Sequence, residues 1–397
     1  MQIKNKKNFM WNTDVLFSKV PKLKNVPINI GENISAIKFE AEPYREKKYT
    51  WVFAVIGKPD SVLFPKPKNG YPAIVLVHGG GGQVFIDWVK YWNNKGYIAI
   101  AFDTYGNELD NNLEKVKNID AGPSYCNTGI MDNPDDEKNS WIYHNVSNVI
   151  LSNNILRARE DVDKEKIVAT GISWGSFILC ITCAIDKRFA AFAPVYGGAY
   201  IYNDTFFIND CSSPSAFGGK KRKKWIKKFD ASSYLSFAQK PMLFVSGIDD
   251  PAFSVINRVK TYRLVKAKKY FSMRSDLEHD HVWYKTDEIH YFFNSVLFGA
   301  EISIINGLIR EGDRVRLSYD NKLFDTVRVI YTESNDVDSH KWKFITEIIE
   351  EKDGIYSYKL PPTVTAYAFE TENSHTGHRM SSRIYLSRNC KKIRKFM

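Results

Sequence analysis

The stretch Lys166-Ile-Val-Ala-Thr-Gly-Ile-Ser-Trp-Gly175 decides how the rest of the chain is interpreted. Residues 166–170 predict a buried strand, and the apolar residues 177–181 that follow predict a helix. Gly171 and Gly175 stand two positions on either side of Ser173, where a Cβ would press on the neighbouring strand or helix. Such a turn exposes the Ser173 hydroxyl above the sheet, beside helix N-terminal amides that can face a developing oxyanion. The stretch therefore predicts a serine nucleophile.

A second glycine-rich turn follows the apolar run Pro72-Ala-Ile-Val-Leu-Val77, and it reads His78-Gly-Gly-Gly-Gly82. The run predicts a strand buried on both faces. Glycines after such a strand let backbone N–H groups approach a ligand, as an oxyanion hole requires. We expect the amides of Gly80, Gly81 and Trp174 to form that hole, because the Lys-Ser/Thr of a phosphate-binding loop is absent. His78 precedes the serine and is interpreted as a structural hydrogen-bonding residue.

Apolar strand-like runs alternate with helical patterns along the first three quarters of the chain. The predicted strands are 72–77, 97–102, 166–170, 188–196, 241–247 and 269–273, and the predicted helices are 84–94, 141–159, 177 onward, 253–265 and 287–297. This alternation favours an α/β fold with a doubly wound, mostly parallel sheet. Sites in such folds lie at the carboxyl ends of the strands.

Polar residues follow two later strands at that edge of the predicted sheet. Asp250 comes three residues after Gly247, and His279 follows the strand at 269–273. A serine hydroxyl is a poor nucleophile near neutral pH, so a histidine must take its proton and a carboxylate must orient that histidine. We expect Ser173, His279 and Asp250 to be catalytic, with Asp249 and His281 as the alternatives.

The net charge of +11 does not imply a nucleic-acid partner. Seven basic residues lie in 220–228 and four in 391–397, with no acid in either segment, and together they account for the whole excess. A solvated charged surface is the simpler interpretation of residues 220–228, and attraction of an anionic substrate is the alternative.

The five cysteines are interpreted as reduced thiols, with Cys180 and Cys183 as small buried residues on one helix face. The residue pattern gives no convincing metal site and implies no cofactor. The basic N-terminus lacks an apolar signal core, and no apolar stretch reaches transmembrane length. We therefore expect no membrane partner and a cytoplasmic protein, or a secreted or periplasmic one if a signal was removed before this numbering.

The composition changes after residue 299. We expect an N-terminal extension over residues 1–44, a catalytic domain over 45–299 and a small C-terminal β domain over 300–397. The last segment alternates polar and apolar residues with a period of two, which is typical of a β-sandwich. Two roles are open for this domain: it can support the catalytic domain structurally, or it can bind a carbohydrate or a partner. Residues 105–140 and 199–235 are interpreted as insertions that border the site.

The chain resembles the α/β-hydrolase superfamily, and within it the acetylxylan esterases and the dienelactone-hydrolase-like carbohydrate esterases. The matching motifs are the glycine turn with Trp88-Val-Lys-Tyr-Trp92, Gly171-Ile-Ser-Trp-Gly-Ser176, Val195-Tyr-Gly-Gly198 and Gly247-Ile-Asp-Asp-Pro-Ala-Phe253. The resemblance covers roughly residues 45–300 and implies a triad in the order Ser173, Asp250, His279. Dienelactone hydrolases use a cysteine nucleophile, so Ser173 favours the esterases. Residues 220–228 have no counterpart in the pattern.

The resemblance implies a serine esterase that removes short acyl groups such as acetyl from a carbohydrate or another small-molecule ester through an acyl-enzyme. A peptidase of the prolyl-oligopeptidase type and a non-catalytic binding protein with the same fold are the alternatives.

Overall fold

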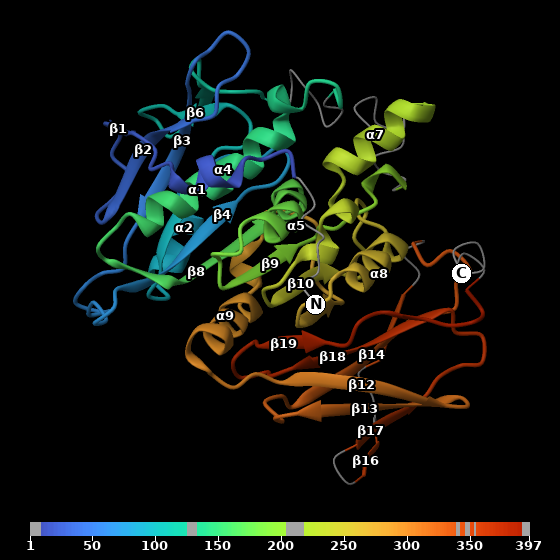
Figure 1. Cartoon of the computed structure of the whole chain (residues 1–397). Helices are drawn as coiled ribbons and strands as arrows, with labels where there is room; N and C mark the ends of the chain where they lie inside the picture. The colour runs from blue at the N-terminus through green and yellow to red at the C-terminus, as the bar shows by residue number, and fades with distance from the viewer. Residues whose placement is uncertain are drawn as a thin grey trace, which may run out of the picture.

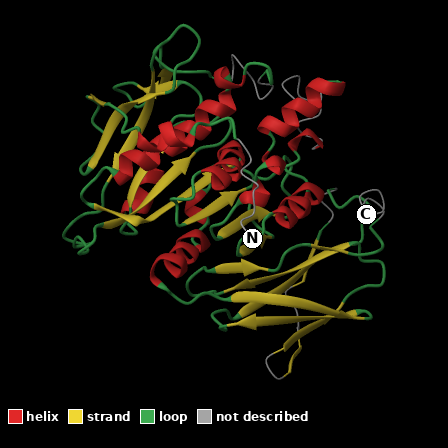
Figure 2. Ribbon diagram, viewed as in Figure 1, coloured by secondary structure: helices red, strands yellow, loops and turns green. Residues whose placement is uncertain are grey.

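A computed structural model of the chain describes residues 9–124, 133–203, 218–338, 342–345, 350–352 and 355–390. Its main sheet runs through both the α/β part and the C-terminal strands (Figures 1 and 2). Within the described ranges, no helix combines the length and the apolar composition that a membrane crossing requires.

The α/β part of the main sheet has a parallel centre. In spatial order its strands are β1 (Leu23–Val26), β2 (Ile34–Ala41), β3 (Thr50–Gly57), β5 (Ile98–Phe102), β4 (Tyr71–Val77), β8 (Val162–Ile172), β9 (Ala191–Val195), β10 (Met242–Gly247) and β11 (Lys269–Arg274). The pairs from β5 to β11 are parallel, and β1, β2 and β3 join antiparallel to one another and to β5. This confirms the predicted doubly wound, mostly parallel sheet.

Helices cover both faces of this sheet. They are α1 (Thr13–Ser18), α2 (Ile86–Asn93), α4 (Trp141–Arg157), α5 (Trp174–Ile185), α7 (Gly219–Phe229), α8 (Val255–Leu264) and α9 (Glu288–Phe298). α4 packs against α1 and α5, whereas Trp92 of α2 contacts Phe293 of α9. Every residue of β4 and of α5 is buried, so the two segments that carry the predicted chemistry are fixed by the core.

The C-terminal strands form two layers. β19 (Arg379–Ser381), β18 (Ala366–Glu372), β14 (Thr326–Thr332) and β15 (Lys343–Ile345) extend the main sheet beyond β11, and β20 (Tyr385–Leu386) pairs with β18. β12 (Ile304–Glu311), β13 (Arg314–Asp320), β17 (Ile355–Lys359) and β16 (Glu350–Lys352) form a second sheet.

The alternation along these strands places side chains in two different cores. Val329 and Tyr331 face the second sheet, where they pack in a cluster with Leu317. Ile330, between them, belongs to the main core of the α/β part. Because successive side chains of a strand point to opposite faces, this layer is buried on one face against the α/β part and on the other against the second sheet. The C-terminal strands agree with the expected sandwich, and one of its layers is continuous with the sheet of the α/β part.

The predicted extension and the insertions have defined elements. β1 and β2 lie in the segment expected to be an N-terminal extension, and both are strands of the main sheet. The 105–140 insertion contains a hairpin of β6 (Asn107–Leu109) and β7 (Lys115–Lys117). The three-part division of the chain stays a prediction.

The basic run 220–228 forms most of helix α7. Trp225 and Phe229 are the buried residues of this helix, so its apolar side is anchored in the protein. Lys224 pairs with Asp135, and Lys228 pairs with Glu137. The basic run is therefore partly neutralised by the insertion beside it.

Cys180 and Cys183 are buried free thiols on α5, as their spacing suggested, and Cys390 is also buried. Cys126 and Cys211, and the basic segment 391–397, lie outside the described residues.

Candidate functional site

Ser173 occupies a strained turn between β8 and α5. Its backbone has φ 55° and ψ −114°, a conformation that a residue with a side chain rarely adopts. A Cβ on Gly171 would come within 2.8 Å of the Gly175 backbone, and a Cβ on Gly175 would come within 2.0 Å of the Val77 carbonyl oxygen. Both flanking glycines are thus required by close backbone approach, as the sequence predicted.

The structure brings Ser173, His279 and Asp250 into one line of hydrogen bonds. His279 Nε2 lies 3.0 Å from Ser173 Oγ, and His279 Nδ1 lies 2.9 Å from Asp250 Oδ2. A carboxylate can only accept, so Nδ1–H donates to Asp250 and Nε2 is left to accept the Ser173 proton. The carboxylate that accepts this hydrogen bond from His279 is Asp250, the residue preferred over Asp249 in the sequence analysis.

Asp250 is held rigidly in its turn after β10. Its side chain is fully buried. Its Oδ1 accepts the N–H groups of Ala252 and Phe253, each at 2.8 Å, which leaves Oδ2 for His279. The rings of Tyr196 and Phe253 lie against the His279 ring, at centroid distances of 4.8 and 6.0 Å. These contacts fix the orientation of the imidazole.

His281 has a different position from His279. Its Nε2 accepts the N–H of Gly79 at 3.1 Å, and its ring packs on Phe85 at 4.8 Å between centroids. Burial, with a smaller contribution from His78, lowers the pKa of His281 to about 4. The neutral ring can keep a lone pair for Gly79 at neutral pH. His281 therefore contacts the glycine turn rather than Ser173.

His78 binds the other side of Gly79. Its Nδ1 lies 2.9 Å from the Gly79 carbonyl oxygen, and its Nε2 accepts the Thr104 N–H at 2.9 Å. Nδ1 therefore carries the proton. This agrees with the structural role predicted for His78, and it places the Gly79 peptide groups between two histidines.

The three predicted oxyanion donors lie in different surroundings. A Cβ on Gly80 would come within 2.9 Å of Trp174 Cδ1, so these two residues are adjacent. Gly81 has φ 70° and open space where its Cβ would be. The geometry brings Gly80 and Trp174 together beside the Ser173 turn and leaves Gly81 on the outer side, where its carbonyl oxygen accepts from Lys115 Nζ at 3.3 Å.

Sequence reasoning did not find the partners of Gly79 or the contacts of Tyr105. The Tyr105 hydroxyl lies 3.2 Å from where a Gly80 Cβ would stand. Its ring packs on His78 with 5.7 Å between centroids. The only signal in the sequence was its place just after the strand at 97–102, among the polar residues of the first insertion.

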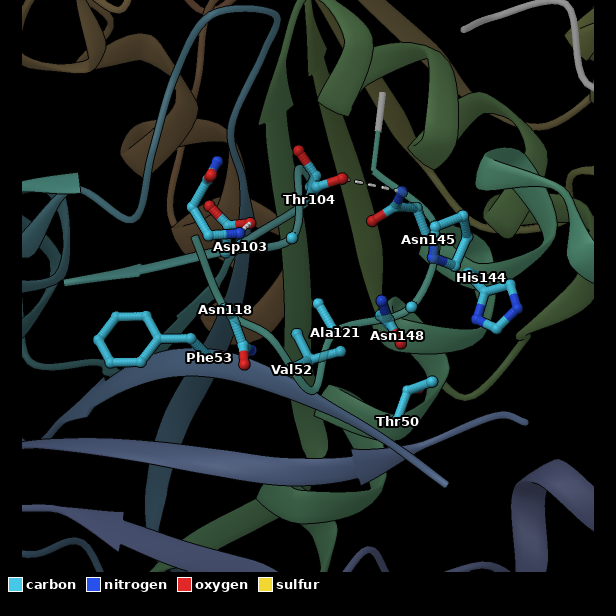
Figure 3. A pocket seen from close by; sticks show the side chains of 14 residues that line it. Thr50, Val52, Phe53, Asp103, Thr104, Asn118, Ala121, His144, Asn145 and Asn148 are labelled. Atoms are coloured by element: carbon cyan, nitrogen blue, oxygen red, sulfur yellow. Dashed lines mark hydrogen bonds between the residues drawn. The ribbon is translucent and has the colours of Figure 1, made fainter. Parts of the chain in front are cut away.

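A small polar cavity lies between the segment after β5 and helix α4 (Figure 3). Its volume is about 20 Å³, enough for about one water molecule. Asp103 and Thr104 line it on one side, and His144, Asn145 and Asn148 of α4 line the other. Because Ser173 and His279 do not line it, this cavity is separate from the predicted catalytic groups. Within the described residues, no group of three or more His, Cys, Asp or Glu side chains gathers as a metal site.

Comparison with solved structures identifies the fold. The acetyl xylan esterase from Paenibacillus sp. R4 is similar over 72% of this chain and 92% of its own, with 15% identity and a TM-score of 0.57. Acetyl Xylan Esterase 1 from Thermoanaerobacterium sp. JW/SL YS485 matches over 72% and 93%, with 14% identity and a TM-score of 0.54. The acylaminoacyl peptidase of Pyrococcus horikoshii matches over 68% and 43%, with 15% identity and a TM-score of 0.51. The chain has the α/β-hydrolase fold.

The sequence comparison narrows this class. Residues 43–213 match the model of the acetyl xylan esterase family, over less than half of the chain. This confirms the resemblance to acetyl xylan esterases and supports a carbohydrate esterase. No curated protein matches the chain in sequence.

Proposed function

We propose that this protein is a serine esterase that removes acetyl or other short acyl groups from a carbohydrate, with Ser173 as nucleophile, His279 as general base and Asp250 as the carboxylate of the triad. The observation that carries the proposal is the hydrogen-bonded line from Asp250 through His279 to Ser173, at 2.9 and 3.0 Å. The match of residues 43–213 supports the esterase class.

In the first half of the proposed reaction, Ser173 Oγ attacks the ester carbonyl carbon while His279 Nε2 takes the hydroxyl proton. Negative charge develops on the carbonyl oxygen, and the N–H groups of Gly80 and Trp174 are the proposed donors to it. Each such donor stabilises the transition state by about 3 kcal/mol. His279 then gives its proton to the leaving alcohol, and an acyl-enzyme on Ser173 remains.

In the second half, water takes the place of the alcohol. His279 removes a proton from the water as it attacks the acyl carbon, and the same amides hold the second oxyanion. The C–O bond to Ser173 breaks, Oγ recovers the proton from His279, and the short acid leaves. In each half Asp250 accepts the hydrogen bond from Nδ1–H and stabilises the imidazolium that forms.

Covalent labelling tests the nucleophile. We expect a fluorophosphonate to label the native protein at Ser173, and Ser173→Ala to abolish labelling while the circular dichroism spectrum is retained. A native protein that is folded and remains unlabelled would favour the non-catalytic binding protein instead.

A substrate panel tests the acyl and alcohol groups. Aryl esters with acyl chains from two to about ten carbons should show highest kcat/KM for the shortest, and acetylated xylan should release acetate. The fold similarity to an acylaminoacyl peptidase makes an amino-acyl anilide the informative competitor. Preference for the anilide or for the longest acyl chain would reject the carbohydrate esterase.

A further inference from the structure

We propose that the C-terminal β region holds the two loops that carry Asp250 and His279, so that residues of this region position the hydrogen-bonded catalytic groups. The inference rests on the proposed roles of Asp250 and His279. It gives the C-terminal region a part in the reaction, although that region lies outside the segment that matches the esterase family, residues 43–213.

The His279 loop begins where β11 is paired with β19. Phe271 is opposite Ser381 in this antiparallel pair, and Ser381 Oγ accepts the Met273 N–H at 2.7 Å. Figure 1 shows β19 and β18 (red) next to α9 and the α/β sheet. The C-terminal strands therefore fix the last residues of β11, from which the chain enters the His279 loop.

The next two residues of the loop are bound by side chains from β18 and β19. Ser275 Oγ donates to Glu370 Oε2 at 2.9 Å, and Glu370 is 1% exposed. Arg379 Nη1 lies 2.6 Å from Asp276 Oδ1. His279 is three residues beyond Asp276. Because the backbone between them is short, a displacement of Asp276 would also displace His279.

Arg274 connects Asp276 to the far end of the His279 loop. Its Nε donates to Asp276 Oδ1 at 3.0 Å, and its Nη1 donates to the Lys285 carbonyl oxygen. Arg274 therefore ties both ends of the segment 274–285, which contains His279 and His281. Because Asp276 accepts from Arg274 and from Arg379, it links this internal tie to the C-terminal strands.

The Asp250 loop is held by a different part of the C-terminal region. Asp338 Oδ1 accepts the N–H of Val255 at 2.7 Å, at the first turn of α8. The neighbouring Val337 is fully buried in the main core, and its carbonyl oxygen accepts from Trp342 Nε1 at 3.0 Å. Residues 250–255 thus contact His279 through Asp250 and Phe253 and contact the C-terminal region through Val255.

Two separate contacts on the two loops have a common consequence. The Ser173–His279 and His279–Asp250 bonds require the loops after β10 and β11 to keep their relative position. Misplacement of a reacting group by about 1 Å can lower a rate by roughly 100-fold. Contacts that join both loops to the C-terminal region would restrict movement of one loop relative to the other.

The test uses variants of the full chain. Arg379→Met removes the ion pair with Asp276 together with those to Glu370 and Glu372, and Arg379→Lys restores a cation. Asp338→Ala removes the acceptor for Val255, and Asp338→Asn restores an oxygen acceptor. Arg316→Met is the matched control, because Arg316 lies on β13 of the second sheet and pairs with Glu311 at 3.1 Å on an exposed surface.

We expect Arg379→Met to lower kcat on an aryl acetate by about 10- to 100-fold with KM changed less than about threefold. We expect Asp338→Ala to act in the same direction, the Lys and Asn variants to recover most of the loss, and Arg316→Met to stay within twofold. Hydrogen exchange followed by mass spectrometry should show faster exchange in 274–281 for Arg379→Met and in 250–256 for Asp338→Ala.

Unchanged kcat and exchange in folded Arg379→Met and Asp338→Ala proteins would overturn the inference. If Arg379→Met does not fold, kcat and hydrogen exchange of the Asp338→Ala and Asp338→Asn variants test the inference instead. Absence of esterase activity in the native protein would reject the proposed function, whereas the exchange rates would still report whether the C-terminal strands hold the two loops.

Discussion

At the scale of single residues, the geometry of Gly79 explains why two histidines flank the glycine turn. His78 holds the Gly79 carbonyl oxygen and His281 holds the Gly79 N–H. The carbonyl of Gly79 shares one planar trans peptide with the N–H of Gly80, and the two groups point in opposite directions. Fixing the carbonyl therefore fixes the direction of the proposed oxyanion donor.

We expect the acceptor on His281 to matter for rate through this turn. His281→Met should lower kcat by about tenfold with little change in KM, because the Gly79 N–H loses its partner. His281→Gln, which offers an oxygen near the position of Nε2, should recover most of the activity. Steady-state kinetics on an aryl acetate distinguish the two.

The comparison for these variants is His279→Ala, in which loss of the general base should lower kcat by at least about 1,000-fold. Severe loss in His281→Met together with a mild loss in His279→Ala would reverse the assignment of the two histidines.

At the scale of elements, the packing of α5 against β4 depends on Gly175. A Cβ there would lie 2.0 Å from the Val77 carbonyl oxygen, and both elements are fully buried, so neither can move aside freely. We expect Gly175→Ala to lower the free energy of unfolding by roughly 3 kcal/mol, at the upper end for overpacking. Urea denaturation measures this change.

Gly218 provides the control for the same substitution. It precedes α7 with φ −82°, and a Cβ there meets nothing within 4 Å. We expect Gly218→Ala to change the free energy of unfolding by less than about 0.5 kcal/mol. Equal effects at the two glycines would show that close packing at the Ser173 turn does not limit stability.

At the scale of the whole molecule, several buried or half-buried histidines make the fold sensitive to acid. Burial lowers the pKa to about 4 in each of His144, His281, His290 and His378. In the unfolded chain these rings titrate near pH 6.5. Between about pH 6.5 and 4 the unfolded state binds more protons, so the stability present above pH 6.5 is lost as the pH falls.

We expect Tm to fall steadily over that range. His144 faces the polar cavity in Figure 3 and lies away from Ser173, which makes it suitable for a test. His144→Gln should reduce the dependence of the unfolding free energy on pH by up to about 1.4 kcal/mol per unit. A slope equal to that of the native protein would show that His144 does not contribute.

The sequence by itself determined the order of the main strands and helices of the α/β part, because the period of the apolar residues is a local property of the chain. It also pointed to Ser173, Asp250 and His279, since each follows a predicted strand at the same edge of the sheet, with Asp249 and His281 as the alternatives. The helix α7 was not recognised, because its many lysines conceal the apolar pair Trp225 and Phe229, four residues apart.

Only the tertiary structure decided how distant segments meet. Gly79 and His281 are 202 positions apart, and no local pattern connects them. Likewise, the alternation in residues 300–397 predicted strands but could not show that β19 would pair with β11 and place Arg379 on Asp276. Edge pairing and ion pairs between distant segments depend on which surfaces come together in the packed molecule, and long-range contacts decide this.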